Sequence, residues 1–395
     1  MNSFNENNGI KRLCSDLSEN SKIDPKLYDK FYVKRGLRNK DGTGVVAGIT
    51  NICNVHGYVV NEGDVEPIDG ELIYRGYSIK ELVANVEKED RFGFEEIAYL
   101  LLTGRLPSSN ALKGFSAYLA ERRELPQGFV VDMILKAPSK NIMNKLGRSV
   151  LALYSYDDEC ENHSIENEMR IAIDLIAKLP VIMTNAYQVK KSHYENKSMI
   201  MHHLIKDYNT AETILSLLRM DRSFTKEEAQ LLDTMLMLHA EHGGGNNSTF
   251  TCRVLTSSGT DAYSAYASAI GSLKGPRHGG ANIKVMHMLD DFKSNVKDWE
   301  NEGQVADHMR KVLNKEANDG SGLIYGMGHA VYTLSDPREV ILKRFAQALA
   351  EEKGMTEEFE LYNRVENIAG KLIMEHRKLF KNVCANVDFY SGFVY

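Results

Sequence analysis

Three histidines beside glycines, one arginine and one aspartate stand out because their side chains could serve a single reaction. His242, His278 and His329 occur in the stretches HGGG, HGG and GMGH, and Arg338 and Asp388 follow them along the chain. A carboxylate can remove a weakly acidic C–H proton, and histidines can stabilise the resulting enolate or polarise an acceptor carbonyl. An arginine fork matches the carboxylate of an acid substrate. The set therefore suits enolate chemistry on an acid substrate.

The stretch GLIYGMGHAVYTLSDPR, residues 322–338, surrounds His329 with glycines. A histidine in such a loop is better placed to reach a ligand than one packed in a core. In isolation, Arg338 after Asp-Pro is equally explained as a helix start with a solvated arginine. Asp388 lies in NVDFYSG, and apolar neighbours raise the pKa of a carboxyl and make it a better base. An ordinary turn-capping aspartate is the alternative.

Two further motifs leave several interpretations open. In LHAEHGGGNNSTF, His239 and His242 lie three apart near a predicted helix C-terminus and so share one face, and the glycines then end the helix. They could cap the helix, anchor a substrate, or bind metal, although HxxH lacks the four-residue spacing of zincin helices and a third ligand. GSLKGPRHGGAN, which contains His278, is no P-loop because no Gly-Lys-Ser/Thr follows; a basic surface turn is the alternative.

The elements that position these motifs are predicted to be mainly helices. SIKELVANV from Ser78 and TKEEAQLLDTMLMLHAEH from Thr225 open with capping-box signals. The second places apolar residues and His239 at i, i+3, i+4 and i+7. GFEEIAYLLLTG and DAYSAYASAIGSL also predict helices, each ending at a glycine, the second at Gly271. The polar stretch 155–166 predicts a loop or a surface helix start.

Strand-like text is confined to about residues 44–75, where GVVAGITNI and GYVV are short, β-branched and punctuated by glycine. The fold class predicted is therefore all-α, with a small β element near the N-terminus. The first roughly 25 residues are expected to be loosely held. We find no internal repeat and no low-complexity segment.

Composition favours an ordinary globular protein. The chain has 395 residues, 43% hydrophobic and 26% charged, with a net charge of −6 that does not favour bulk nucleic-acid binding. No apolar run approaches the roughly 18–20 residues of a membrane span, and the polar N-terminus lacks a secretory core. Five distant cysteines argue against a disulfide framework. We therefore expect a cytoplasmic protein.

Taken together, IDGELIYRGYSIKEL, LHAEHGGGNNSTF, GPRHGGAN, GHAVYTLSDPR and NVDFYSG resemble the citrate synthase family in order and approximate spacing. The resemblance implies a predominantly helical two-domain fold. Its large domain would span residues 1–278 and its small domain residues 279–390. Residues 391–395 would begin a return to the large domain, with the remainder absent.

The resemblance also implies condensation of acetyl-CoA with oxaloacetate and hydrolysis of citryl-CoA. Asp388 would take the methyl proton of acetyl-CoA, and His278 would hydrogen-bond the thioester oxygen. His329 would polarise the oxaloacetate carbonyl, Arg338 would hold a carboxylate, and His242 would bind oxaloacetate as well.

The resemblance also implies roles for residues near these positions. Gly326 and Gly328 belong to a loop that would follow the CoA thioester arm, and Lys381 would contact a CoA phosphate. His239 would lie next to the oxaloacetate site. The resemblance implies acetyl-CoA as co-substrate with no other cofactor and no metal. It further implies a homodimer that closes after oxaloacetate binds, with no nucleic acid or membrane as partner.

The sequence departs from the family pattern in several places. The family's chains continue several dozen residues past NVDFYSG and supply two more substrate-binding arginines, one of them to the partner's site. If Tyr395 ended the whole polypeptide, carboxylate binding would be weakened and the dimer interface incomplete. Arg277, Gly243 and Ala385 replace an apolar residue, a glutamate and a proline that are common in the family.

Three other functions compete with citrate synthesis. A 2-methylcitrate synthase shares these motifs and uses propionyl-CoA. A truncated, inactive homologue would only bind CoA or a partner, although His278, His329 and Asp388 are intact. A zinc hydrolase built on His239 and His242 would contain bound metal.

Overall fold

The structure is a computed structural model that describes residues 24–30, 32, 48–62, 64–276, 278–379 and 382–394. The chain divides after Gly48 into two units. Among the described residues, the first unit contributes the short helix α2 (Pro25–Lys30) and the second contains the other elements. The predicted loose N-terminal segment lies almost wholly outside the described residues.

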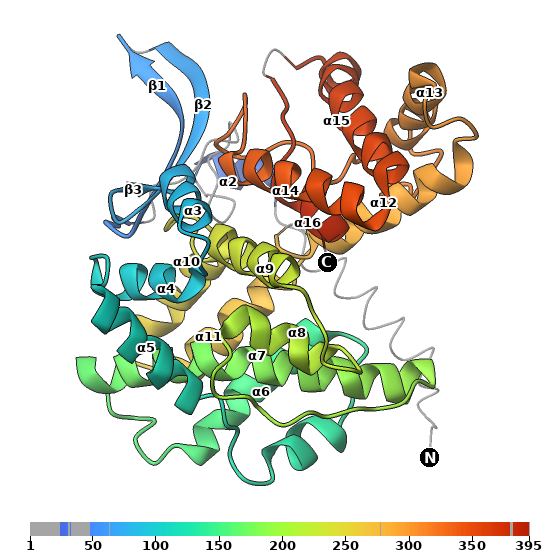
Figure 1. Ribbon diagram of the computed structural model, residues 1–395. Coiled ribbons are helices and arrows are strands. Elements are labelled where there is room, and N and C mark those ends of the chain that lie inside the picture. Colours follow the sequence, from blue (N-terminus) through green and yellow to red (C-terminus); the bar gives the residue numbers. More distant parts are fainter. Residues whose placement is uncertain are drawn as a thin grey trace, which may run out of the picture. The chain divides into compact units, whose positions relative to one another are not determined.

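The second unit begins with a three-stranded antiparallel sheet in the order β1-β2-β3. Its strands are β1 (Cys53–Asn61), β2 (Asp64–Tyr74) and β3 (Tyr77–Ser78). Cys53, Leu72 and Tyr74 are buried at the base of the β1–β2 hairpin, whereas Val60 and Val65 near its tip are exposed. In Figure 1 the tip extends away from the helices. The predicted β element is confirmed, but residues 48–52 of the strand-like text form no strand, and residues 44–47 are not described.

Helices make up most of the remainder, with a π-helical turn at Val130–Leu135 and a 3₁₀ turn at Tyr154–Tyr156. In chain order they are α3 (Ile79–Lys88), α4 (Phe94–Thr103), α5 (Ser109–Glu121), α6 (Ile142–Leu153), α7 (Ile165–Glu195), α8 (Thr210–Leu218), α9 (Lys226–His239), α10 (Asn247–Thr256), α11 (Ala262–Leu273), α12 (Ala281–Asn295), α13 (Glu302–Leu313), α14 (Pro337–Lys353), α15 (Thr356–Arg377) and α16 (Asp388–Val394). The prediction of an all-α fold is confirmed.

The helix termini test the local predictions. Thr225 and Glu228 form the predicted capping box of α9, and α4 ends at Gly104 in a left-handed conformation. Ser78 precedes α3 and also ends strand β3, but its side chain makes no cap hydrogen bond, so the predicted capping box is not formed there. The predicted end of a helix at Gly271 was wrong: α11 continues to Leu273, and a glycine inside a helix costs only about 1 kcal/mol.

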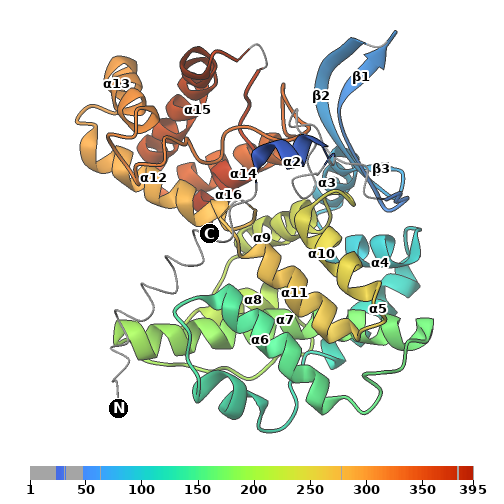
Figure 2. The ribbon, with the colours of Figure 1, turned by 180° about the vertical axis from the view of Figure 1, so that it is seen from behind.

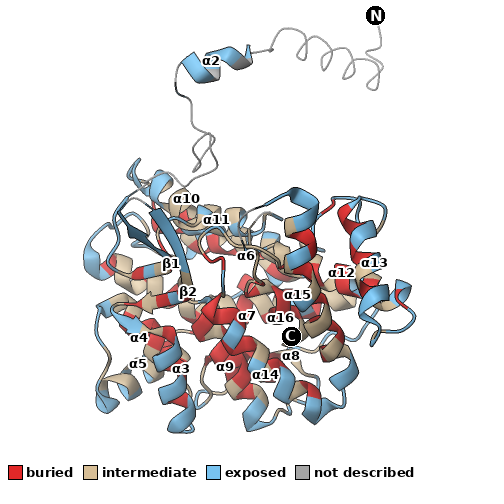
Figure 3. Ribbon diagram, turned by 90° about the horizontal axis from the view of Figure 1, so that it is seen from above, coloured by how far each residue is buried: buried red, intermediate tan, exposed pale blue. Residues whose placement is uncertain are grey.

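Two main groups of buried apolar residues hold the helices together. The larger joins the base of the hairpin, α3, α4 and α9 to α12–α16, and the smaller lies among α6, α7 and α11. Figure 2 shows α10, α11 and α6 side by side, and these helices contact one another in that order. Figure 3 shows buried residues on α9, α14 and α15 where they face the larger group. The catalytic candidates lie at the edges of this larger group.

The predicted domain boundary between residues 278 and 279 stays a prediction. Within the described ranges, no helix combines the length and apolar character needed to cross a bilayer.

Candidate active site

A short backbone ladder brings two of the predicted catalytic residues together. The N–H of Gly328 donates to the carbonyl of Cys384 at 2.7 Å, and the N–H of Asn386 donates to the carbonyl of Gly326 at 2.8 Å. The Asn386 side chain also donates to the carbonyl of Gly328 at 2.9 Å. His329 follows one strand of this ladder directly, and Asp388 follows the other after two residues. The ladder thereby pairs residues 326–328 with residues 384–386, and each of the two candidates follows one of these paired segments.

The glycines of this ladder are required by its backbone path. Gly326 and Gly328 have φ angles of 76° and 90°, which side chains disfavour. A Cβ on Gly326 would also lie 2.8 Å from the ring of Phe389, the residue after Asp388. With any other residue at position 326, the loop could not approach the segment that carries Asp388 so closely.

His329 is held in one tautomer by its own loop. Its Nδ1 accepts hydrogen bonds from the backbone N–H groups of Val331 and Tyr332, at 3.0 and 3.1 Å. The ring proton must then reside on Nε2. Burial lowers the pKa of His329 to about 4, so the ring is neutral at pH 7. Nε2–H is therefore a preformed hydrogen-bond donor.

His242 lies against His329, with ring centroids 5.1 Å apart. Burial lowers the pKa of His242 to about 2, and the positive charge of Arg338 adds to this effect. Its Nε2 is buried and has no hydrogen-bond partner among the described residues. A buried polar atom without a partner costs free energy, which a ligand could recover. His242 is thus a neutral ring with one nitrogen available to a ligand.

The prediction that His239 and His242 share one helix face was wrong, because α9 ends at His239. The hydroxyl of Tyr74 donates to the carbonyl of Glu241 at 2.9 Å and also lies 3.2 Å from the carbonyl of Met237, at the C-terminus of the helix. His242 lies in the following loop. His239 instead donates from Nδ1 to the carbonyl of Met235 at 2.8 Å, as a helix-terminal histidine would.

Arg338 is buried in an ion pair with Asp336. Its Nε and Nη2 donate to the two carboxylate oxygens at 3.0 and 2.7 Å, and both residues are less than a tenth exposed. Nη1 has no hydrogen-bond partner within the described part of the chain. Asp336 Oδ2 also accepts from the N–H of Val387 at 3.3 Å, which connects the start of α14 to the segment that carries Asp388.

Asp388 is the first residue of α16, and its neighbours in the sequence, Val387, Phe389 and Tyr390, are buried. Burial raises its pKa to about 6, against the lowering effect of Arg338. Its backbone N–H donates to the Asn386 side chain at 3.0 Å. The predicted apolar setting is thus present, and the carboxyl is a stronger base than an exposed aspartate.

His278 lies on a different segment from the other candidates. Its Nε2 is 2.9 Å from the hydroxyl of Ser248 in α10, and burial lowers its pKa. Four residues later, Asn282 in α12 donates to the hydroxyl of Ser391 in α16, so the His278 segment is tied to the helix of Asp388. Within the described ranges, no ring contact or hydrogen bond joins His278 directly to His329, Arg338 or Asp388.

Comparison with known proteins places the chain in a family. The family model described as "Citrate synthase, C-terminal domain" matches residues 40–395. The chain belongs to the citrate synthase family. It is therefore a member of a family of condensing acyltransferases, and the resemblance inferred from the sequence is confirmed.

Individual relatives agree with this membership. The chain is 32% identical to a citrate synthase of Corynebacterium glutamicum, an alignment that covers 85% of this chain and 73% of the relative. It is also 32% identical to a 2-methylcitrate synthase of Shewanella oneidensis, over 82% of this chain and 77% of the relative. The crystal structure of citrate synthase from Thermotoga maritima superposes with a TM-score of 0.67 at 28% identity, covering 89% of this chain and 82% of that one.

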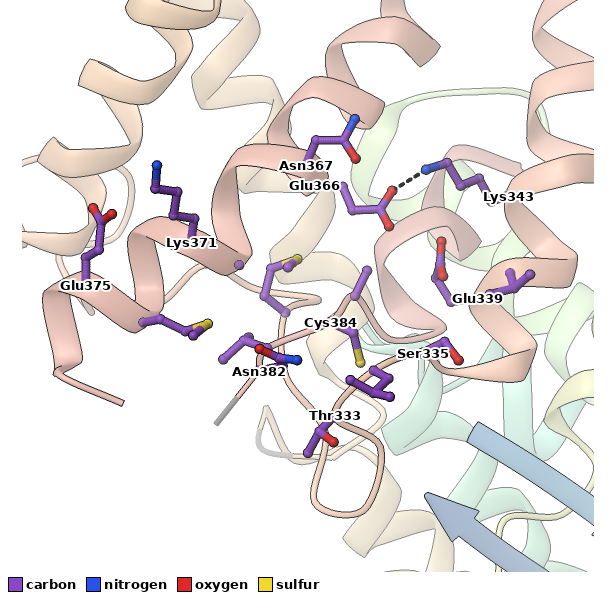
Figure 4. Close-up of a pocket in the computed structure, with 17 residues that line it drawn as sticks. Thr333, Ser335, Glu339, Lys343, Glu366, Asn367, Lys371, Glu375, Asn382 and Cys384 are labelled. Atoms are coloured by element: carbon purple, nitrogen blue, oxygen red, sulfur yellow. Dashed lines mark hydrogen bonds and ion pairs between the residues drawn. The ribbon is translucent and has the colours of Figure 1, made fainter. Parts of the chain in front are cut away.

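A cavity of about 760 Å³ adjoins the ladder of this citrate synthase fold. Figure 4 shows it between α14, α15 and the segment that contains Cys384, with Lys343 paired to Glu366 at 2.7 Å. Glu339 also lines it, and its Oε1 is buried without a hydrogen-bond partner among the described residues. Burial, reinforced by the charge of Glu366, raises the pKa of Glu339 to about 8. The cavity therefore contains a carboxyl that favours the protonated form.

Some predicted residues gain no structural account. Lys381 and Arg277 lie outside the described residues. In the ranges that are described, no cluster of three potential metal-ligating side chains occurs, and His239 and His242 acquire no third such neighbour.

The sequence motifs did not indicate three further residues of the site: Asp336, Ser248 and Tyr332. Asp336 was expected only as part of an Asp-Pro helix start, whereas its side chain also binds Arg338. Ser248 lies in the quoted motif LHAEHGGGNNSTF, but thirty residues separate it from His278. Tyr332 lies three residues after His329, and only its aromatic character could have suggested the ring stack that it forms.

Proposed function

We propose that the protein condenses an acyl-CoA with oxaloacetate, and that acetyl-CoA is the acyl donor and citrate the product. The observation that carries this proposal is the ladder between residues 326–328 and 384–386, which fixes neutral His329 and the basic carboxyl of Asp388 beside Arg338. Family membership supports the same reaction class.

Oxaloacetate would bind where His242, His329 and Arg338 converge. Nε2–H of His329 would donate to the ketone oxygen, and the unpartnered Nε2 of His242 would bind a second polar group. Arg338 would offer Nη1 to a carboxylate while Asp336 keeps the guanidinium in place. Neutral histidines suit this task, because a fixed N–H donor needs no proton from solvent.

The acyl thioester would lie between Asp388 and His278. If the Ser248 hydroxyl donates to Nε2 of His278, then Nδ1–H is free to donate to the thioester oxygen. Gly326 and Gly328 would follow the thioester arm, and Lys381 would contact a phosphate of CoA. His239 would remain a neighbour of the oxaloacetate site without a direct contact.

The reaction follows from these positions. Asp388 takes a proton from the acyl methyl group, and the C–H electron pair forms the enolate, whose oxygen His278 stabilises. The enolate carbon then attacks the ketone carbon of oxaloacetate, and His329 assists protonation of the alkoxide. Water finally cleaves the thioester to give citrate and CoA thiol. Acetyl-CoA is a co-substrate in this scheme, which needs no further cofactor and no metal.

The second candidate is 2-methylcitrate synthesis from propionyl-CoA, favoured by 32% identity to a 2-methylcitrate synthase. Release of CoA thiol by the purified chain, with oxaloacetate and either acyl-CoA, separates the two. Faster turnover of acetyl-CoA supports citrate synthesis, and faster turnover of propionyl-CoA moves the assignment to 2-methylcitrate. No turnover of either by the folded protein would contradict both.

A homodimer and a cytoplasmic location rest on the family resemblance and on composition. Light scattering at micromolar protein concentration tests the dimer: a monomer mass would contradict it.

A further inference from the structure

Tyr332 lies flat against the imidazole of His329. The ring centroids are 4.5 Å apart and the planes differ by 23°, a stacked arrangement. The backbone N–H of the same tyrosine is one of the two donors to Nδ1 of His329. The two backbone donors hold the Nδ1 edge of the His329 imidazole. The stacked Tyr332 ring holds the plane of that imidazole, and so the direction in which its Nε2–H points.

We propose that Tyr332 is a positioning residue for His329, and that the β1–β2 hairpin serves the active site by fixing Tyr332. This inference rests on the role proposed above for His329. Tyr332 itself faces no substrate in this account and acts only through the histidine.

The hairpin contacts Tyr332 at several points. The tyrosine is 1% exposed, and its hydroxyl donates to the carbonyl of Glu71 in β2 at 3.2 Å. A Cβ on Gly57 in β1 would lie 3.1 Å from Cδ1 of the tyrosine ring, and a Cβ on Gly70 in β2 would lie 2.8 Å from it. Each strand therefore has a glycine where it contacts Tyr332, and the absence of side chains there lets the tyrosine ring pack closely against both strands.

The same strand also fixes the far end of the loop. The N–H of Gly70 donates to the hydroxyl of Ser335 at 3.1 Å, and that hydroxyl donates to Asp69 at 3.0 Å. The loop from Tyr332 to Ser335 is thus attached to the hairpin at both ends, immediately before Asp336 and Arg338. The hairpin base holds the part of the loop that carries the stack.

Position matters here because Nε2–H must meet the ketone oxygen as charge develops on it. A displacement of about 1 Å can cost on the order of 100-fold in rate. Tyr332 also meets His242 edge-on, with ring centroids 5.6 Å apart, but only its contact with His329 combines a stacked ring with a hydrogen bond. Loss of the tyrosine ring should affect turnover more than substrate affinity.

The kinetic test compares two variants with a matched control. Tyr332→Leu removes the stack and should lower kcat about 10- to 100-fold, with a smaller change in the KM for oxaloacetate. Tyr332→Phe keeps the stacked ring and loses only the hydrogen bond of the hydroxyl, so its kcat should stay within about 3-fold of the wild-type value. Tyr263→Leu is the control: this tyrosine is 3% exposed and hydrogen-bonds Asp157 among α6, α7 and α11. Its loss should lower stability while leaving kcat near the wild-type value.

Two readouts separate positioning from general stability. In the His329→Ala background, Tyr332→Leu should cause no further fall in kcat, since the residue acts through the histidine. Nitrogen NMR of His329 should show the Nε2–H tautomer in all three proteins, because the backbone donors to Nδ1 remain, but the signals should be broadened or shifted in Tyr332→Leu, where the ring has lost its stacked neighbour.

An unchanged His329 spectrum in folded Tyr332→Leu would overturn the proposal, as would a normal kcat. The NMR result does not depend on activity. If the wild type fails to condense any acyl-CoA, the proposed function is wrong, while the spectrum still decides whether Tyr332 positions the ring.

Discussion

Asp336 and Arg338 face each other in a buried ion pair, although only Pro337 separates them in the sequence. Asp336 also accepts a hydrogen bond from Val387, the residue before the proposed base. The pair therefore joins the substrate-binding arginine to the catalytic segment. It also leaves only part of the guanidinium for substrate, which the sequence did not indicate.

Removal of Asp336 should destabilise the fold because it leaves a buried, unpaired cation. We expect Asp336→Ala to lower the free energy of unfolding by about 3–5 kcal/mol. Asp307→Ala, which breaks the exposed pair with Arg310, should cost less than about 1 kcal/mol. Urea unfolding of both variants measures the difference, and equal costs would show that the buried pair is not structural.

Arg338→Lys should weaken oxaloacetate binding while preserving the positive charge next to Asp336. Lysine lacks the planar fork that can serve Asp336 and a substrate carboxylate together. We expect the KM for oxaloacetate to rise about 10-fold or more, with a smaller change for the acyl-CoA. Arg344→Lys, on the exposed side of the same helix and paired with Glu87, is the control. An unchanged KM in Arg338→Lys would remove the arginine from the substrate site.

Ser248→Ala tests the orientation of His278. Loss of the hydroxyl should release the ring and lower kcat about 10-fold, the equivalent of one hydrogen bond. Ser272 lies in the neighbouring helix α11 and accepts a hydrogen bond from Asn247. Its replacement, Ser272→Ala, should leave kcat unchanged. If both variants turn over like the wild type, His278 needs no support from Ser248.

Much of the site could be predicted from sequence because its chemistry lies in short motifs. Asp388 among apolar neighbours, His329 in its glycine loop and the family resemblance were all available from the printed residues. The end of α9 before His242 was not: the Tyr74 hydroxyl that hydrogen-bonds the last carbonyls of this helix lies 163 residues away from Met237 in the sequence. The continuation of α11 through Gly271 was missed for a related reason: packing against α6 and α10 outweighs the weak preference of one glycine. The partner of Arg338 was hidden because a motif does not specify side-chain orientation.

Glu339 should make stability depend on pH. Its pKa is raised from 4.5 to about 8 in the folded protein, so the unfolded chain releases the proton first as pH rises. The contribution of Glu339 to the free energy of unfolding is therefore fully present below about pH 4.5, and it is lost as the pH rises towards 8. Glu339→Gln, which keeps the shape without the charge, should flatten this decline and raise stability at pH 9 by as much as about 5 kcal/mol, since each pKa unit is worth about 1.4 kcal/mol. Chemical denaturation at pH 5, 7 and 9 measures it, and parallel curves for wild type and variant would contradict the shift.

The most direct test of the account is the pH dependence of CoA thiol release by the wild type and by Asp388→Asn. Because the pKa of Asp388 is raised to about 6, and those of His329 and His242 are lowered to about 4 and 2, one ionisation should limit the wild type near pH 6. We predict that kcat/KM of the wild type rises with pH to about 6 and then levels. Asp388→Asn should be about 1,000-fold less active on this plateau and should lack the rise near pH 6, while still binding oxaloacetate. Near-normal turnover by Asp388→Asn would show that Asp388 is not the base.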